Sequence, residues 1–165
     1  MSLPAYDDLL ALPVSAEAVV DPSHIDANGH MNVRFYLEYT ALGTAGLVEE
    51  LGITDSYRGD RRMGLFTAEH HLRYFSELHE GDKLSVHVRV LDRGARAAHL
   101  MAFLLDRTRD CLSNTLELTV VHVDMDTRQP VPFPDDIAAG FDQLVDASHA
   151  LDWAAPVCGA MGVRR

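Results

Sequence analysis

The chain has 165 residues and a mass of 18.2 kDa, the size of one domain that buries about two-thirds of the surface of its unfolded chain. Hydrophobic residues make up 47% and charged residues 24%, which excludes a disordered or low-complexity chain. No apolar run approaches the roughly 18 residues of a membrane span, and Asp7 and Asp8 argue against a signal peptide. Cys111 and Cys158 are too far apart to predict a disulfide framework or a thiolate cluster. We therefore expect a cytoplasmic protein without a membrane partner.

The charge balance is strongly acidic, with 14 basic and 25 acidic residues and a net charge of −11. This field repels polyphosphate, so nucleic acid is not an expected partner. Among the basic residues, Lys83 is the only Lys and all others are Arg. That bias follows from a G+C-rich genome as readily as from a need for phosphate contacts.

The N-terminal part of the chain predicts a leader and one strand. Residues 1–13 contain one short amphipathic turn, and residues 14–21 have the pattern of a strand that Pro22 closes. Residues 23–30 are polar and rich in turn formers.

A long buried helix follows directly. Asn32 is a plausible N-cap, and from Val33 to Leu51 the apolar residues recur at helical spacing until Gly52 ends the pattern. These 19 residues correspond to roughly 28 Å of helix. Residues 55–63 are then expected to form a polar loop.

The remaining sequence changes to a period of two, which is typical of strands. Four strands are predicted around residues 68–75, 84–90, 97–105 and 112–125, with turns between them that indicate a four-strand antiparallel meander. A short helix is expected over residues 135–147. One long helix against one sheet predicts an α+β fold, in which a five-stranded sheet curls around the helix. The open edges of such a sheet are usually paired between subunits, so a homo-oligomer is expected.

The densest chemistry lies just before the helix, in the stretch Asp26-Ala27-Asn28-Gly29-His30-Met31-Asn32. Helix starts present free N–H groups and favour negative charge. A carboxylate or imidazole could activate water there, while N–H groups could bind a developing oxyanion. The same residues are also ordinary turn formers and caps, so the spacing alone leaves both interpretations open.

The segment from His24 to Leu37, HIDANGHMNVRFYL, resembles the signature of hot-dog-fold acyl thioesterases, which include the 4-hydroxybenzoyl-CoA thioesterase-like acyl-CoA hydrolases. The order of predicted elements matches that family over residues 14–126. Residues 68–74, 80–82 and 122–124 further resemble thioesterases associated with carnitine degradation, including betainyl-CoA thioesterases. The resemblance implies one hot-dog domain over residues 1–165, with peripheral segments 1–13 and 150–165.

The resemblance also implies roles for individual residues. Asp26 matches the catalytic carboxylate, which acts as general base or as nucleophile. Asn28 and His30 match positions that orient water or polarise the thioester. Further residues are expected to hold the oxyanion or the substrate: Gly29, Met31, Asn32, Val33, Tyr36 and Glu69. Many relatives have a second Asn where this chain has Val33, which leaves the roles of the polar neighbours open.

No cofactor or metal is expected. The nine histidines form no HExxH or comparable spacing, and His87, His99 and His122 fall on predicted strands where they could satisfy cross-strand hydrogen bonds. No GxSxG motif is present, which disfavours a serine nucleophile.

The expected activity is hydrolysis of an acyl-CoA thioester by a homodimer or a dimer of dimers, with the site near the subunit interface. Two alternatives remain at this point: a hot-dog hydratase or dehydratase, and a non-catalytic acyl-CoA-binding protein.

The phosphates of CoA would need local basic residues. The candidates are Arg58, Arg61, Arg62, Arg93, Arg96, Arg107 and Arg109.

Overall fold

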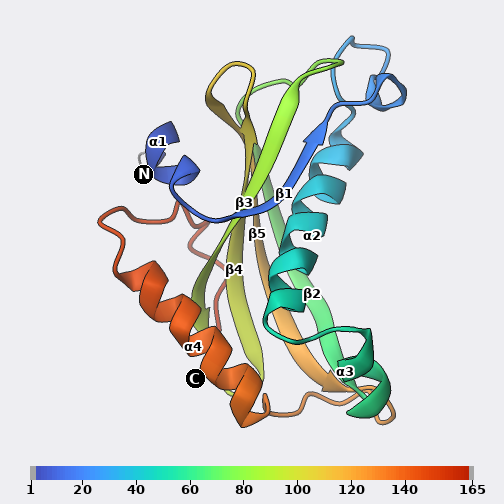
Figure 1. Ribbon diagram of the computed structural model, residues 1–165, viewed down its shortest axis with the longest axis vertical. Helices are drawn as coiled ribbons and strands as arrows, with labels where there is room; N and C mark the ends of the chain where they lie inside the picture. Colours follow the sequence, from blue (N-terminus) through green and yellow to red (C-terminus); the bar gives the residue numbers. More distant parts are fainter. Residues whose placement is uncertain (1–2, 164–165) are drawn as a thin grey trace. The chain divides into compact units, whose positions relative to one another are not determined.

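The computed structural model describes residues 3–163, which form one five-stranded antiparallel sheet and four α-helices (Figure 1). The strands are β1 (Val14–Val19), β2 (Met63–Tyr74), β3 (Lys83–Arg93), β4 (Ala97–Asp106) and β5 (Cys111–Asp124). The helices are α1 (Tyr6–Leu10), α2 (Val33–Glu50), α3 (Asp55–Asp60) and α4 (Asp135–His149), with a 3-10 turn at Pro22–His24. The expected α+β fold is confirmed. Among the described residues, no helix has both the length and the apolarity that crossing a membrane requires.

The sheet order is β1-β3-β4-β5-β2, so the predicted four-strand meander is wrong at its first strand. Only β3, β4 and β5 follow one another as neighbours, and β2 is an edge strand beside β5 (Figure 1). The end of β2 is fastened to β5 by Asn114 Nδ2, which donates to the Arg73 carbonyl at 2.8 Å, and by the Phe75 amide, which donates to the Ser113 carbonyl at 2.9 Å. A period-two pattern identifies a strand but not its partner, and the connection of residues 75–82 is too long to impose a hairpin.

The expected loop at residues 55–63 instead contains α3. Thr54 caps this helix, because its Oγ1 accepts a hydrogen bond from the Tyr57 amide at 3.4 Å. Tyr57 is buried, so tertiary packing stabilises a helix that is too short to form on its own. Strand β2 then begins at Met63, five residues before the start of the predicted strand.

Helix α2 begins at the predicted residue and ends one residue earlier than expected. Asn32 caps it, since its Oδ1 accepts from the Arg34 amide at 3.1 Å, and Gly52 at φ +89° ends it. A Cβ at Gly43 would lie 2.4 Å from Cγ1 of Val86 on β3, so the helix and this strand are packed more closely than any other residue would allow.

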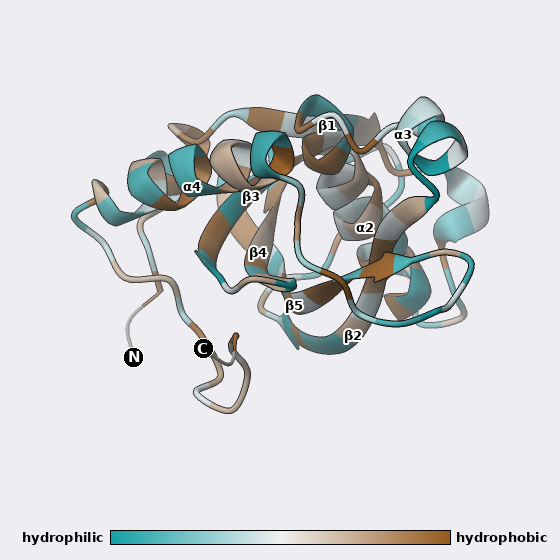
Figure 2. Ribbon diagram, turned by 90° about the horizontal axis from the view of Figure 1, so that it is seen from below, coloured by the Kyte–Doolittle hydropathy of each residue, from teal (hydrophilic) through white to brown (hydrophobic). Residues whose placement is uncertain are grey.

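The contacts divide the chain into two compact units. The first comprises residues up to 46, 72–88 and 102–116, and its core includes the fully buried Leu9, Met31 and Leu78. The second comprises residues 47–71, 89–101 and 117 onward. In this unit α4 separates hydrophilic from hydrophobic residues on its faces (Figure 2) and buries Phe141, which stacks near Phe133 with ring centroids 5.0 Å apart.

Candidate functional site

The segment that precedes α2 folds into a small closed loop within the first unit. Ile25 and Met31 form an isolated antiparallel bridge. Inside it, the Asp26 amide donates to the His30 carbonyl and the Gly29 amide to the Asp26 carbonyl, both at 3.0 Å. Gly29 has φ +83°, a conformation that favours glycine, so the sequence of turn formers produces the turn for which it is suited.

The carboxylate of Asp26 holds this loop at two points. Its Oδ1 accepts from the Asn28 amide at 2.8 Å, and its Oδ2 accepts from Asn32 Nδ2 at 3.3 Å. The side chain is half-buried, and each oxygen keeps lone pairs for a further partner. Asp26 is therefore a positioned carboxylate that water can reach.

Three of the expected oxyanion donors already have partners, the first of which is the Gly29 amide described above. The Met31 amide donates to the Leu78 carbonyl at 2.7 Å, and the Asn32 amide donates to the His24 carbonyl at 2.9 Å. Within residues 3–163, the amide N–H groups of His30 and Val33 have no hydrogen-bond partner. The structure thus reduces the predicted set of backbone donors to these two, of which Val33 is the first residue of α2.

A cleft of about 210 Å³ opens beside the start of α2. It is lined by His30, Met31, Val33, Tyr36, Tyr74, Phe75, Ser76 and Glu77. Four of these residues are predicted site residues, and the other four come from the end of β2 and the connection that follows it. The sequence analysis missed this second group, because nothing local in residues 74–77 indicates what lies opposite them.

Tyr36 connects the two walls of the cleft. Its hydroxyl oxygen accepts a hydrogen bond from the Leu78 amide at 3.0 Å, and its ring meets the Tyr74 ring edge to face with centroids 5.3 Å apart. Burial raises the pKa of the Tyr36 phenol above its ordinary value, so the hydroxyl stays protonated at neutral pH. The Tyr36 side chain is therefore part of the wall of the cleft and contacts the opposite wall.

The remaining predicted residues differ in whether they line the cleft. His30 lines the cleft, and its Nδ1 lies 3.4 Å from the Met31 carbonyl oxygen. Asn28 is exposed and contributes its backbone to the turn. Glu69 is exposed on β2 and is not among the residues that line the cleft. Asp26 does not line it either, but Asn32, its hydrogen-bond partner, directly precedes the lining residue Val33.

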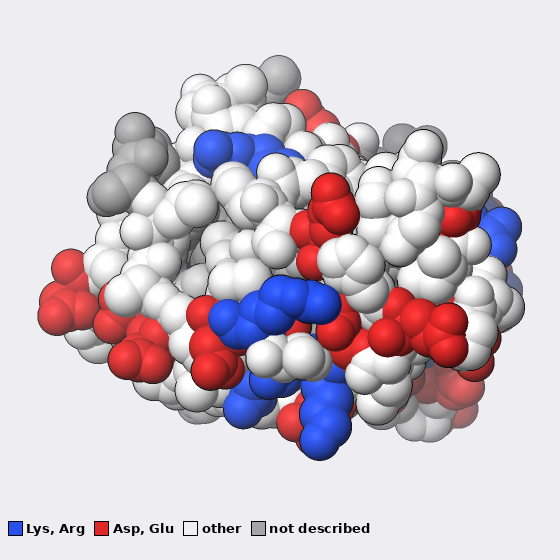
Figure 3. Space-filling view, turned by 90° about the horizontal axis from the view of Figure 1, so that it is seen from above, with Lys and Arg blue, Asp and Glu red and all other residues white. Residues whose placement is uncertain are grey.

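Most of the candidate arginines for CoA are paired with carboxylates. Ion pairs join Arg58 to Asp55, Arg61 to Asp136, Arg62 to Asp126, Arg93 to Asp142, and Arg109 to Asp82 and Asp106. Figure 3 shows Lys and Arg side chains interspersed with Asp and Glu on the face that it presents. Arg107 differs from these five because it lines a second cleft together with Lys83 and Glu17, between β1 and β3. Its Nε is buried without a hydrogen-bond partner among the described residues.

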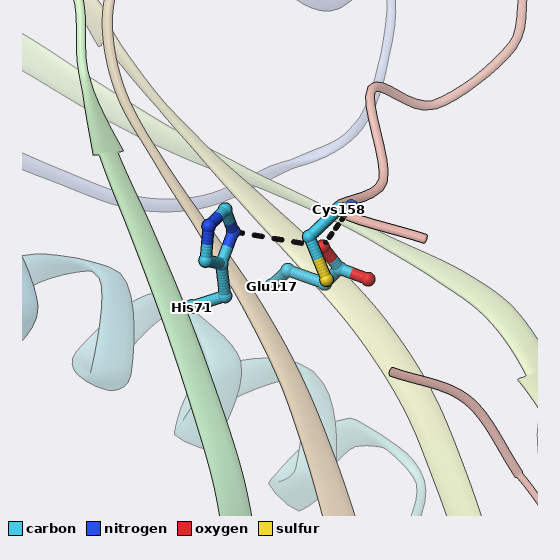
Figure 4. A group of neighbouring side chains, drawn as sticks. All are labelled: His71, Glu117 and Cys158. Atoms are coloured by element: carbon cyan, nitrogen blue, oxygen red, sulfur yellow. Dashed lines mark hydrogen bonds and ion pairs between the residues drawn. The ribbon is translucent and has the colours of Figure 1, made fainter. Parts of the chain in front are cut away.

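A second cluster of reactive side chains lies in the other unit. His71 on β2, Glu117 on β5 and Cys158 in the C-terminal segment point toward one another (Figure 4), with ligand atoms all within 4.8 Å of one another. The sequence analysis expected no metal site, and the separation of these residues along the chain offers no motif that could have revealed one.

Comparison with known proteins identifies the family of this fold and site. The sequence model of the thioesterase-like superfamily matches residues 20–141. A betainyl-CoA thioesterase of Pseudomonas aeruginosa is 29% identical over 136 residues, which are 82% of this chain and 85% of that protein. An L-carnitine dehydrogenase/betainyl-CoA thioesterase of Ruegeria pomeroyi is 29% identical over 92% of this chain, which spans 31% of that protein. A Staphylococcus aureus protein solved in complex with CoA has a TM-score of 0.79 at 21% identity, covering 93% of this chain and 97% of that one.

Proposed function

The chain belongs to the thioesterase-like superfamily and is a thioester hydrolase, and from this premise we propose that Asp26 is the general base that cleaves its acyl-CoA substrate. The observation that carries the proposal is the loop at the start of α2. This loop places a half-buried carboxylate, two backbone donors without partners and the wall of a cleft within a few residues of one another.

In the proposed reaction, Asp26 takes a proton from a water molecule that attacks the thioester carbonyl carbon. The N–H groups of His30 and Val33, at the positive end of the α2 dipole, stabilise the charge that develops on the carbonyl oxygen. The C–S bond then breaks, and a free acid and the CoA thiol leave. Asp26 is not among the residues that line the cleft, and both its oxygens already accept hydrogen bonds, so a water between carboxylate and thioester fits better than direct attack.

The experiment is release of free thiol from acyl-CoA by the purified chain and by Asp26→Asn. General-base catalysis typically contributes about 10²–10⁴-fold, so the variant should fold and lose activity in that range. Asp21→Asn is the matched control, because Asp21 also accepts bonds from a turn, at Ser23, but lies away from the cleft lining. Near-normal turnover by folded Asp26→Asn would overturn the assignment.

A single turnover in H₂¹⁸O separates the two roles of the carboxylate. A general base directs the label into the released acid alone, whereas a nucleophile whose anhydride is hydrolysed at the Asp26 carbonyl leaves the label in Asp26 and releases unlabelled acid.

For the acyl group, we propose a short chain that ends in a quaternary ammonium group. The cleft combines the rings of Tyr36, Tyr74 and Phe75 with the carboxylate of Glu77, and aromatic faces with a nearby negative charge favour such cations. Two relatives are named for betainyl-CoA, an acyl-CoA of this class.

The sharpest test compares betainyl-CoA with 3,3-dimethylbutyryl-CoA, which has the same shape without the charge. Cation–π contacts contribute about 0.5–2 kcal/mol, so kcat/KM should be roughly 2- to 30-fold higher for the cation. The preference should shrink in Tyr74→Leu and in Glu77→Gln. An equal or higher rate with the neutral acyl group would contradict this choice while leaving the thioesterase reaction itself intact.

Assembly is proposed to be at least a homodimer. Strand β2 is an edge strand, and it exposes the five consecutive residues 66–70, among them Phe66 at 39%. A long open edge with an exposed aromatic residue favours pairing with a second copy. Light scattering that finds an active species of one chain would contradict this proposal.

A further inference from the structure

The cluster of His71, Glu117 and Cys158 has the composition of a metal site. Imidazole, carboxylate and thiolate together are the ligand set of borderline-soft divalent ions such as Zn²⁺. The residues come from β2, β5 and the C-terminal segment, so their proximity is created by the tertiary fold (Figure 4).

The spacing supports coordination. The nearest ring nitrogen of His71, Nδ1, lies 3.8 Å from Oε2 of Glu117, which is too long for a hydrogen bond. Zinc bonds to these ligand types measure about 2.0–2.3 Å, which places tetrahedral ligands about 3.3–3.8 Å apart. The cluster therefore needs only small side-chain adjustments to close around one ion.

Hydrogen bonds to both oxygen atoms fix the orientation of the Glu117 carboxylate. Its side chain is only 1% exposed, its Oε1 accepts from His99 Nε2 at 2.9 Å, and its Oε2 accepts from the Cys158 amide at 2.7 Å. Oriented carboxylates of this kind are typical of metal sites, where second partners fix the ligand. A buried carboxylate also needs a compensating positive charge.

The turn that follows Cys158 holds its sulfur in place. The Ala160 amide donates to its Sγ at 3.4 Å, across a turn in which Gly159 adopts φ +81°. One dication beside one carboxylate and one thiolate gives a neutral set, which removes the cost of the buried charge.

We propose that His71, Glu117 and Cys158 bind one Zn²⁺-class ion, with water completing the coordination on the half-exposed side of His71 and with His99 positioning Glu117. On binding, the thiol of Cys158 releases its proton to solvent and the sulfur forms the bond to the metal. The ion joins the C-terminal segment to the sheet. This inference does not depend on the proposed thioesterase mechanism.

The test is titration of the metal-free full chain with Co²⁺, followed by displacement with Zn²⁺. We expect one Co²⁺ per chain with a thiolate charge-transfer absorption. Cys158→Ser should abolish the absorption, and His71→Ala should weaken binding by at least tenfold. His99→Gln should weaken it by about 10–100-fold, as for other residues that orient ligands. Cys111→Ser and His70→Ala are the matched controls, since they change the other cysteine and the neighbouring residue of β2, and should bind as the parent does.

A second measurement needs no variant. Zn²⁺ should slow alkylation of Cys158 by iodoacetamide and leave Cys111 of the same molecule unaffected, as read by mass spectrometry. Absence of a thiolate absorption, equal loss of binding in the two cysteine variants, or unchanged alkylation of Cys158 would each overturn the proposal.

Discussion

The hydroxyl of Tyr36 on α2 accepts a hydrogen bond from the amide N–H of Leu78 at 3.0 Å, and this contact joins the helix to the connection that follows β2. The Leu78 carbonyl in turn accepts the amide of Met31 at 2.7 Å. Leu78 thereby fastens the connection after β2 to the loop that carries Asp26 and to the first turns of α2. Leu78, a buried residue that carries no reactive group, therefore contacts both walls of the cleft.

Removing the Tyr36 hydroxyl should loosen this connection. Tyr36→Phe leaves the N–H of the fully buried Leu78 without a partner, which costs about 1–3 kcal/mol. The measurement is the free energy of unfolding in urea. Tyr74→Phe is the control, because Tyr74 is 49% exposed, and it should change the free energy by less than about 0.5 kcal/mol. Equal effects of the two substitutions would refute this role of Tyr36.

The packing of α2 on β3 should not tolerate an added methyl group at Gly43. Gly43→Ala would place its Cβ 2.4 Å from Cγ1 of Val86, and overpacking of this kind costs about 1–3 kcal/mol. Gly59→Ala in α3 meets nothing within 4 Å and should stabilise the protein by about 0.5–1 kcal/mol. Adding Val86→Ala to Gly43→Ala should recover part of the loss in thermal unfolding, and a lack of recovery would place the strain elsewhere.

Stability should fall as the pH is lowered below about 6.5, the ordinary pKa of histidine. Burial lowers the pKa of His87, whose Nδ1 donates to the Leu12 carbonyl at 2.8 Å while Nε2 accepts from the Ser85 hydroxyl at 2.9 Å. The nearby positive charge of Arg107 lowers this pKa further. The unfolded chain therefore binds a proton that the folded chain excludes, and the neutral form contributes stability that is present above the unfolded pKa.

For this one proton, the free energy of unfolding changes by at most about 1.4 kcal/mol per pH unit. His87→Gln should be less stable at neutral pH but should lose this part of the pH dependence, as measured by urea unfolding between pH 5 and 7.5. The exposed His149 at the end of α4 provides the control, since His149→Gln should keep the parent slope. An unchanged slope in His87→Gln would mean that another group controls the dependence.

Binding of the CoA phosphates should depend on Lys83 more than on the paired arginines. Lys83 and Arg107 line the same cleft, whereas Arg58 is half-buried and paired with Asp55 at 2.8 Å. Lys83→Ala should raise KM by roughly 3- to 10-fold with little effect on kcat, because a contact far from the thioester acts on ground and transition states alike. Arg58→Ala should leave KM unchanged.

An acyl thioester of dephospho-CoA, which lacks the 3′-phosphate, identifies the phosphate group that Lys83 contacts. If Lys83 holds the 3′-phosphate, the parent and Lys83→Ala should bind this substrate equally well. A persistent difference would assign Lys83 to the pyrophosphate, and an unchanged KM for both substrates would exclude this cleft as the phosphate site.

The sequence alone determined most of the elements, and α2 most completely. The helix that starts at Val33 and ends before Gly52 is encoded locally, because a capping Asn, an apolar stripe and a glycine with positive φ act within a few residues of one another. The turn around Asp26 is local in the same sense, since Asn28 and Gly29 supply its conformation.

Only the tertiary structure decided which residues meet. The pairing of β2 with β5 requires contacts between residues about 40 positions apart, and the period of a strand carries no information about its partner. Similar distances along the chain separate Tyr36 from Leu78 and separate Glu117 from both His71 and Cys158. Partners of backbone amides, walls of a cleft and ligands of an ion are properties of packing, and packing brings together residues that the sequence keeps apart.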